Sequence, residues 1–242
     1  MKINTPLHNL IKLDTLTLIT STDFIQSMDT GSFRQSKIIK PNGLNILNHT
    51  LNTKPKGLKR LSVNETFGKV NLSVSSKILG QNYHKGICLK TLDQLRDEVA
   101  KYGLTLNRDF IYDSDLKYVD VKKDIETSNT NTSLYLSTLS SLVASKFVKA
   151  TYDNGISFNE KIKTNPIRCT IYDKQVKMKK DKSFFKNINY TKSENGLLRF
   201  ETRLPKVATI KKYFKSNKLI DVLYKSNFNS QVFEKIIDGQ TK

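Results

Sequence analysis

Three segments of the chain alternate apolar residues with charged or aromatic ones that could do chemistry. Alternate side chains of an extended strand share a face, which gives three groups: Asp120 with Lys122 and Asp124, Tyr172 with Lys174, and Arg199 with Glu201 and Arg203. If these strands are neighbours, Asp120, Asp124 and Glu201 form a hard-oxygen site for Mg²⁺ or Mn²⁺. A solvated sheet face with outward charges explains the same pattern, and periodicity alone does not choose between the two.

A tyrosine that could act as a nucleophile follows the last of these segments. Tyr213 stands in Ile-Lys-Lys-Tyr-Phe-Lys, where its neighbours are Lys211, Lys212 and Lys215. Since a tyrosine hydroxyl has an ordinary pKa of about 10, it needs a polarised phosphate and nearby positive charge. We expect these lysines to supply that charge and to hold DNA. The alternative is an amphipathic tyrosine that packs its ring and exposes its hydroxyl; Tyr224 and then Tyr172 are the reserve candidates.

The charge balance indicates a polyanionic partner. The chain has 41 Lys and Arg against 22 Asp and Glu, a formal net charge of +19, and most of the excess follows residue 140. Such a field attracts and captures nucleic acid, which we favour over an anionic membrane. Lysines are dense from Lys174 to Lys186. The lysines expected to contact DNA, besides the three around Tyr213, are Lys77, Lys177, Lys179, Lys180 and Lys182.

Several other kinds of site find no support in the sequence. Cys88 and Cys169 lie far apart in apolar surroundings, so we expect buried free thiols. The three histidines form no His-x-His pair. We find no phosphate-binding loop, so no nucleotide cofactor is expected. Without a signal-peptide pattern or a stretch of about 18 apolar residues, we expect a cytoplasmic protein with no membrane segment.

The elements that must position these residues alternate along the chain. Strand patterns occupy residues 9–20, the two sides of Pro41-Asn42-Gly43, and residues 70–74, 115–124, 156–159, 168–174 and 197–204. Helices are predicted at 91–104, 134–152 and about 208–224, and residues 126–133 are interpreted as a loop. The interleaving predicts an α+β fold, a central, mostly antiparallel sheet with helices packed on it, in a single compact domain. Within it, residues 1–69 supply N-terminal strands and loops, 70–225 the catalytic core, and 226–242 a C-terminal extension.

Four segments, in order, resemble a known family. Ser75-Ser-Lys-Ile-Leu-Gly80-Gln-Asn-Tyr-His-Lys-Gly86 is similar to a Ser/Lys/Gly/Asn/Gly segment of the replication initiators of filamentous phages, the gene II and gene X products. The segments around Asp120, Ile171-Tyr-Asp-Lys174 and Leu198-Arg-Phe-Glu201-Thr-Arg-Leu204 also resemble initiators of rolling-circle plasmids. Lys117 replaces the arginine that the family prefers, and Val176-Lys177 stands where a glutamate usually follows Tyr-Asp-Lys.

The resemblance implies a replication initiator that nicks one DNA strand at an origin and starts rolling-circle replication. Asp120, Asp124 and Glu201 would hold the divalent ion, and Tyr213 would form the covalent phosphotyrosine link. Lys174, Arg199 and Arg203 would stabilise charge on the phosphate. The expected partners are origin DNA and host replication proteins.

Two other classes of protein remain open at this point. The first is a non-catalytic basic DNA-binding protein, a replication or transcription regulator that keeps the scaffold without the chemistry. The second is a basic packaging protein, which would not need aspartates on internal strand faces. Convergence of the carboxylates near a tyrosine would favour the enzyme.

Overall fold

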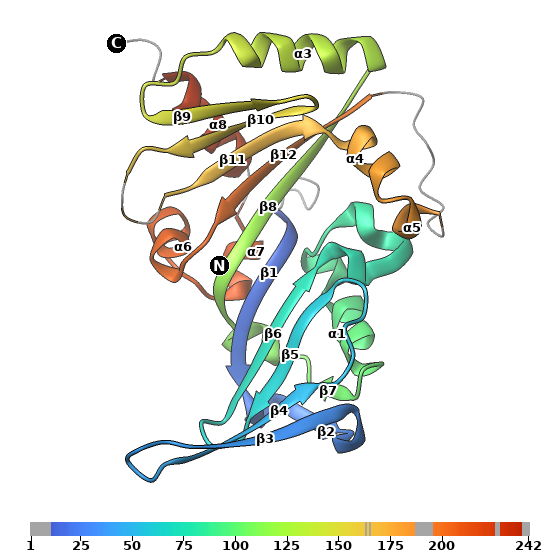
Figure 1. The fold of residues 1–242 in the computed structure, drawn as a ribbon, viewed down its shortest axis with the longest axis vertical. Coiled ribbons are helices and arrows are strands. Elements are labelled where there is room, and N and C mark those ends of the chain that lie inside the picture. The colour runs from blue at the N-terminus through green and yellow to red at the C-terminus, as the bar shows by residue number, and fades with distance from the viewer. Residues whose placement is uncertain (1–10, 163, 165, 187–195, 226–227, 239–242) are drawn as a thin grey trace.

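The computed structural model describes residues 11–162, 164, 166–186, 196–225 and 228–238. It is an α+β fold in a single compact domain, dominated by one ten-stranded sheet (Figure 1). The bounds of its strands are β1 Lys12–Ser21, β3 Phe33–Ile39, β4 Asn45–Leu51, β5 Leu58–Asn64, β6 Lys69–Ser75, β8 Asp115–Thr127, β9 Phe147–Tyr152, β10 Gly155–Glu160, β11 Arg168–Asp173 and β12 Gly196–Leu204. A second, small sheet pairs β2 (Ile25–Met28) with β7 (Leu104–Leu106). The fold class expected from the sequence is confirmed.

The large sheet consists of two halves with the same strand order. Across it the order is β3-β4-β5-β6-β1-β8-β12-β11-β10-β9, and each neighbouring pair is antiparallel. From the centre to the edge, the N-terminal half has the order β1-β6-β5-β4-β3 and the C-terminal half β8-β12-β11-β10-β9. In each half the first strand in sequence is central, the last lies next to it, and the others follow in reverse sequence order. The sequence shows no such repeat. The boundary expected near residue 70 falls inside the sheet, since β6 pairs with both β5 and β1.

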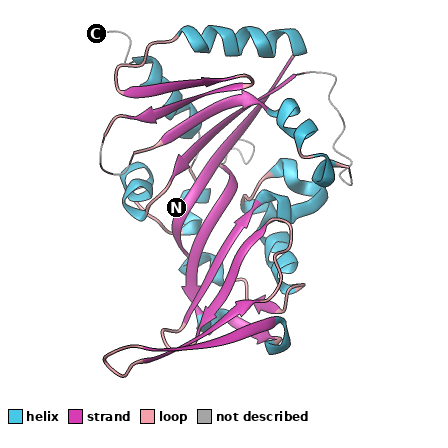
Figure 2. Cartoon of the chain, viewed as in Figure 1, coloured by secondary structure: helices cyan, strands magenta, loops and turns pink. Residues whose placement is uncertain are grey.

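Helices connect the strands; α6 and α7 pack on one face of the sheet, and η4 and α4 contact the opposite face. Their bounds are α1 Leu92–Ala100, α2 Phe110–Asp113, α3 Asn129–Ser141, α4 Lys174–Lys180, α5 Lys182–Phe185, α6 Val207–Phe214, α7 Leu219–Leu223 and α8 Phe228–Asp238. Short 3₁₀ segments are η2 Thr22–Phe24, η3 Thr30–Ser32, η4 Ser76–Lys85 and η5 Leu89–Thr91. Figure 2 shows how the strands form one continuous, twisted layer, with helices at its upper end and along its sides. No helix in the described part of the chain is long and apolar enough to cross a membrane.

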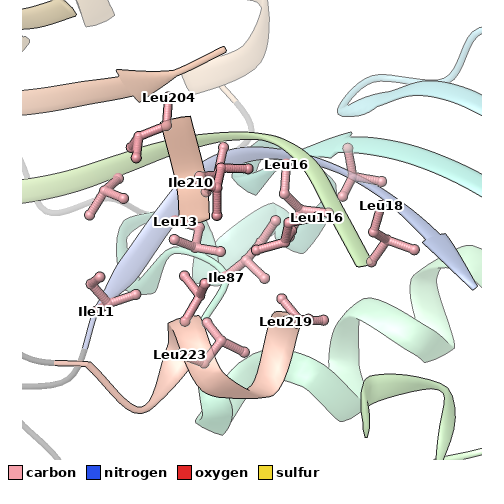
Figure 3. Packing of buried hydrophobic residues seen from close by; sticks show 14 of the residues in the cluster. Ile11, Leu13, Leu16, Leu18, Ile87, Leu116, Leu204, Ile210, Leu219 and Leu223 are labelled. Atoms are coloured by element: carbon pink, nitrogen blue, oxygen red, sulfur yellow. The ribbon is translucent and has the colours of Figure 1, made fainter. Parts of the chain in front are cut away.

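Strand alternation gives the sheet one apolar and one polar face. The apolar face carries buried leucines and valines of the central strands, and Figure 3 shows Leu13 and Leu16 of β1 packed with Ile210 of α6 and Leu219 and Leu223 of α7. Burial of such side chains is the main stabilising contribution to the fold. The opposite face, which we call the polar face, carries hydroxyl, amide and charged side chains from both halves.

Two of the expected elements are wrong. Residues 126–133 are not a loop, because β8 continues to Thr127 and Ser128 caps α3 by accepting a hydrogen bond from the Asn131 amide at 3.2 Å. The helix expected over 134–152 ends at Ser141, and Phe147 begins β9. The final helix is also split, into α6 and α7, at Lys215, whose φ of 64° lies in the left-handed region.

Candidate functional site

The sheet register places the predicted residues of β8, β11 and β12 on the polar face. Asp120 pairs with Arg203, Lys122 with Glu201, and Asp124 with Arg199. Thr170 and Tyr172 of β11 lie opposite Glu201 and Arg199 on the other side of β12. The alternation expected from the sequence therefore holds for β8 and β12. Lys174 is the exception, because the strand ends at Asp173 and Lys174 begins α4.

These residues separate into two groups, of which the first is a buried ion cluster. It consists of Asp14, Tyr83, Lys122, Asp124, Lys174 and Arg199. The guanidinium of Arg199 is 1 % exposed and donates to both oxygens of Asp124 at 2.6 Å. Its remaining donor contacts both Asp14 Oδ1 at 3.1 Å and the Tyr83 hydroxyl at 3.0 Å. Such a bidentate pair, with its guanidinium fully buried, is a structural anchor between elements distant in sequence.

The electrostatics of the ion cluster balance without a charge on Lys174. Burial and the nearby Arg199 guanidinium lower the pKa of Lys174 to about 6, and the same two causes lower that of Lys122 to about 8. Burial raises the pKa of Asp14, but Lys122 and Arg199 more than offset this and hold it well below its usual range. At neutral pH two carboxylates thus face two cations, while Lys174 is uncharged and hydrogen-bonded to Tyr83.

The ion cluster changes the position expected for three site residues. Asp124, Lys174 and Arg199 were expected at the metal and the phosphate, but the structure holds them together inside the protein. A phosphate could reach Arg199 only by displacing its two carboxylates. We therefore assign these three residues to the protein interior and not to contact with a substrate.

The second group, which we call the carboxylate site, lies on the same face nearer the centre of the strands. Here two carboxylates of adjacent strands each accept a hydrogen bond from a tyrosine. Tyr118 donates to Asp120, with both oxygens at 2.8 Å, and Tyr172 donates to Glu201 Oε2 at 3.0 Å. Arg203 Nε lies 3.1 Å from Asp120 Oδ1. Since neighbouring positions across the pair are Asp120–Arg203 and Lys122–Glu201, the two carboxylates are diagonal neighbours.

Cations and a cavity surround the outer part of the carboxylate site. Lys177 of α4 donates to the Tyr172 hydroxyl at 3.2 Å and lies 4.5 Å from the centre of its ring. A cavity of about 370 Å³ opens beside these groups. Its lining is mainly polar and basic: Tyr152, Asn154, Gly155, Arg168, Thr170, Tyr172, Lys177, Glu201 and Arg203. The arrangement offers an anionic ligand three cationic side chains next to two carboxylates.

Asp120 and Glu201 are the two carboxylates of this site that could contribute oxygens to a divalent cation. Burial raises the pKa of Asp120, and the negative charge of Glu201 raises it further. A cation between the two would relieve this repulsion. Mg²⁺ in particular is commonly bound by one or two carboxylates, with waters and substrate phosphate completing its shell. No third His, Cys, Asp or Glu joins them among the residues that the structure describes.

Tyr213, the nucleophile expected from the sequence, lies away from both groups. It is on α6, and its hydroxyl contacts Glu160 Oε1 at 3.5 Å. In β10, Glu160 lies on the same face as the buried Ile156 and Phe158, which is the apolar face of the sheet. Ile210 and Phe214 of the same helix are in the hydrophobic core. Burial and Glu160 raise the pKa of Tyr213 to about 12. The structure thus does not bring Tyr213 to Asp120 and Glu201.

The lysines expected to bind DNA fall in two regions. Lys177, Lys179 and Lys180 lie on α4 next to the carboxylate site and are exposed, while Lys211, Lys212 and Lys215 are exposed around Tyr213. Lys182 is in α5, and its side chain lies outside the described residues. Lys77 forms an ion pair with Asp181 and faces the ring of Phe184. Both thiols were expected to be buried. Cys169 is buried and Cys88 is half-buried, and neither forms a disulfide.

Sequence reasoning missed Asp14 and Tyr83 as members of the site. Tyr83 lies within the segment 75–86 that resembles the phage initiators. This segment contains η4, and its contacts with β1 and β8 hold it against the sheet. Ser76 donates to Asp14 at 2.9 Å. At Gly86, with a φ of 68°, a Cβ would come within 2.7 Å of Lys122. An aspartate near the start of an alternating strand was the available signal for Asp14.

Comparisons with known proteins do not identify the chain: no family model matches it, and no curated protein does. Its function is therefore inferred from the geometry of the carboxylate site and from the charge around it.

Proposed function

We propose that this protein is a replication initiator that nicks one DNA strand through a covalent phosphotyrosine. The observation that supports this most directly is the carboxylate site, where Asp120 and Glu201 each accept a hydrogen bond from a tyrosine beside a basic cavity. The net charge of +19 favours a polyanionic substrate. An initiator of this kind acts in the cytoplasm, where host replication proteins extend the new 3′ end.

Tyr172 is the nucleophile that the geometry favours over Tyr213. It is on the polar face with the carboxylates, its hydroxyl already donates to Glu201, and Lys177 is in hydrogen-bond reach of the same oxygen. Burial, followed by the charge of Glu201, raises its pKa well above the usual range. Tyr172 therefore becomes reactive only when a bound phosphate and additional positive charge offset those two effects.

The proposed step transfers one phosphodiester bond to the protein. The Tyr172 oxygen attacks the phosphorus as its proton passes to Glu201, and the bond from phosphorus to the 3′ oxygen breaks. The departing 3′ oxygen takes a proton from water, which leaves a free 3′-hydroxyl and a 5′-phosphotyrosyl link. Lys177 and Arg203 stabilise the charge on the phosphate. No nucleotide cofactor is needed, because the covalent link conserves the bond for rejoining.

A divalent ion has a defined place in this scheme. Asp120 and Glu201 would hold Mg²⁺ or Mn²⁺, which would polarise the scissile phosphate. Arg203 keeps Asp120 oriented by its 3.1 Å contact, and Tyr118 donates to the same carboxylate. Asp124 is left to its structural pairing with Arg199.

The test is covalent attachment to a labelled single strand in the presence of Mn²⁺. Wild-type protein should form an adduct that survives denaturation, Tyr172→Phe should form none, and Tyr213→Phe should form it at the normal rate. Each substitution removes one oxygen, so the pair is matched. Loss of adduct in Tyr213→Phe with retention in Tyr172→Phe would refute the assignment of the nucleophile. Wild-type protein that binds DNA but never forms an adduct would refute the enzymatic function.

That last outcome describes the second candidate, a non-catalytic DNA-binding protein. Asp120 and Tyr172 are only 3 % and 6 % exposed, and each is already hydrogen-bonded within the protein. This burial is what a purely structural polar network would show. A regulator of replication or transcription would keep the basic surfaces and bind DNA without metal.

A further inference from the structure

The N-terminal half of the sheet repeats the strand arrangement that carries the carboxylate site. β1 and β6 occupy the positions in their half that β8 and β12 occupy in theirs. Where β8 and β12 carry Asp120 and Glu201, the polar face of β1 and β6 carries Thr17 and Ser73, whose hydroxyl oxygens lie 2.8 Å apart. Hydroxyls of this kind cannot hold a divalent ion as carboxylates do, but they donate to phosphate oxygens.

From β6 to the edge strand β3, the strands of this half are free of acidic residues. β3, β4, β5 and β6 contain no Asp or Glu, and the polar face of β3 and β5 presents Arg34 and Arg60, both exposed. By register Arg34 lies opposite Thr50, and Arg60 opposite Ser73. On the same face, beside Thr50 and away from Arg60, the amides of Asn48 and Asn64 meet, with Asn64 Nδ2 2.7 Å from Asn48 Oδ1. Arginine, asparagine and hydroxyl side chains are the usual phosphate-contacting groups of DNA-binding surfaces.

This surface suits a duplex better than a single strand. The five strands β1 and β3–β6 place no aromatic side chain on the polar face; Phe33, the one aromatic in these strands, is buried on the other side. Proteins that hold single strands stack bases on aromatic rings, whereas duplex backbone is held through phosphates alone. At a spacing of about 4.8 Å, the five strands span about 19 Å. Along that length a duplex presents about 11 phosphate charges.

We propose that the polar face of β1 and β3–β6 binds the double-stranded DNA that flanks the strand held at the carboxylate site. The inference rests on the proposed function, which places a DNA strand at the carboxylate site. The two surfaces belong to one continuous sheet joined by the β1–β8 pairing, so a duplex on the N-terminal half can continue from that strand. In this arrangement the two halves of the sheet, which have the same strand order, have different roles. The C-terminal half does the chemistry and the N-terminal half supplies sequence-independent affinity.

The test compares duplex binding by Arg34→Ala/Arg60→Ala with that of a matched control, Lys90→Ala/Lys101→Ala. The control removes the same charge from exposed lysines in and next to the η5 and α1 segments. Fluorescence anisotropy is measured on a 30-base-pair duplex (about three helical turns) and on a short single strand, at several salt concentrations. Loss of two phosphate contacts should reduce the log–log salt slope by about 1.8. If the two proteins bind the duplex equally near 1 M salt, a difference of about 1.8 in slope makes the variant's duplex affinity about 30-fold weaker than that of wild type at 0.15 M salt.

The control should bind the duplex like wild type, and the arginine variant should still form the covalent adduct on the short strand. Equal duplex binding by the two variants would overturn the proposal, as would a loss confined to the single strand. Circular dichroism on each variant separates loss of binding from loss of fold. Because the adduct is measured separately on the short strand, failure of this inference is distinguishable from failure of the nicking activity.

Discussion

The buried, uncharged Lys174 makes the stability of the fold depend on pH in a defined window. The pKa of its ammonium is about 6 in the folded protein, against an ordinary value of 10.5. Between these values the unfolded chain binds a proton that the folded chain does not. Stability therefore rises with pH across this window. The groups that face Lys174 are Asp14, Arg199, Lys122, Lys177 and Tyr83.

The expected slope is about 1.4 kcal/mol per pH unit, because one proton is bound by the unfolded state only. From pH 6.5 to 8 the free energy of unfolding should rise by about 2 kcal/mol. Other members of the ion cluster add little in this range. Lys122 contributes only above its folded pKa of about 8, and Asp14 and Asp124 have pKa values below their usual acidic range. The lowered pKa of His84 matters chiefly below 6.5.

Urea unfolding of Lys174→Met at four pH values from 6.5 to 8 tests this reasoning. Methionine is unbranched, only slightly shorter than lysine, and does not titrate, so the variant should lose the slope, whatever its stability at a single pH. Loss of the hydrogen bond to Tyr83 shifts all points together and costs about 1–3 kcal/mol. Lys180→Met, on the exposed side of the same helix, should keep the wild-type slope. A flat wild-type profile, or the same slope in Lys174→Met, would refute the charge balance that we assign to the ion cluster.

Three other substitutions test individual contacts of the fold and the site. Arg199→Met should lower the free energy of unfolding by about 3–5 kcal/mol, because Asp124 loses its bidentate partner and Asp14 keeps only Lys122 as a counter-charge; urea unfolding would show it, and a loss below 1 kcal/mol (the level of about 0–1 kcal/mol for exposed pairs) would contradict the burial of the Arg199 guanidinium. Glu201→Gln should slow adduct formation even at saturating Mn²⁺, because Tyr172 loses its proton acceptor, and should raise the Mn²⁺ concentration for half-maximal adduct at least about tenfold; an unchanged requirement would place the ion elsewhere. Gly57→Ala should lower the melting temperature much more than Gly43→Ala, since both have positive φ but only a Cβ at Gly57 would overlap the backbone of Ile78; equal effects would argue against that contact.

The strands that build the site were predictable because their alternation is strong. β1, β6, β8 and β12 match the expected segments closely, and the charges of β8 and β12 share a face as the period of two requires. Helix α3 was not predictable in the same way. Its first turn is built from Ser, Asn and Thr, which favour turns and caps. Leu139 packs this helix on the sheet, and that tertiary contact overrides the low propensity.

The division of the charged residues into two groups could not be predicted from spacing. Asp120 and Asp124 share a face of one strand, and nothing in the local sequence distinguishes them. The difference comes from Asp14, which lies 185 residues from Arg199 in the chain, and from Tyr83 on η4. These partners cover one end of the polar face and bury Asp124 with Arg199, while Asp120 keeps a diagonal neighbour in Glu201. The same limit applies to Tyr213, because a helical pattern shows which side is apolar but not which face of the sheet receives it.

The two halves of the sheet have the same strand order but different side chains on the polar face, a carboxylate pair in one and acid-free strands β3–β6 in the other. Two carboxylates on a DNA-binding face repel phosphate unless a cation or an arginine offsets them. In the C-terminal half Arg203 and Lys177 stand beside Asp120 and Glu201 and reduce that repulsion. In the N-terminal half the corresponding strands carry Thr17 and Ser73, so Arg34 and Arg60 act without a competing negative charge from β3–β6. Introducing a carboxylate there, as in Ser73→Asp, should weaken duplex binding without affecting adduct formation on a short strand. If duplex affinity is unchanged in this variant, DNA does not pass over β6.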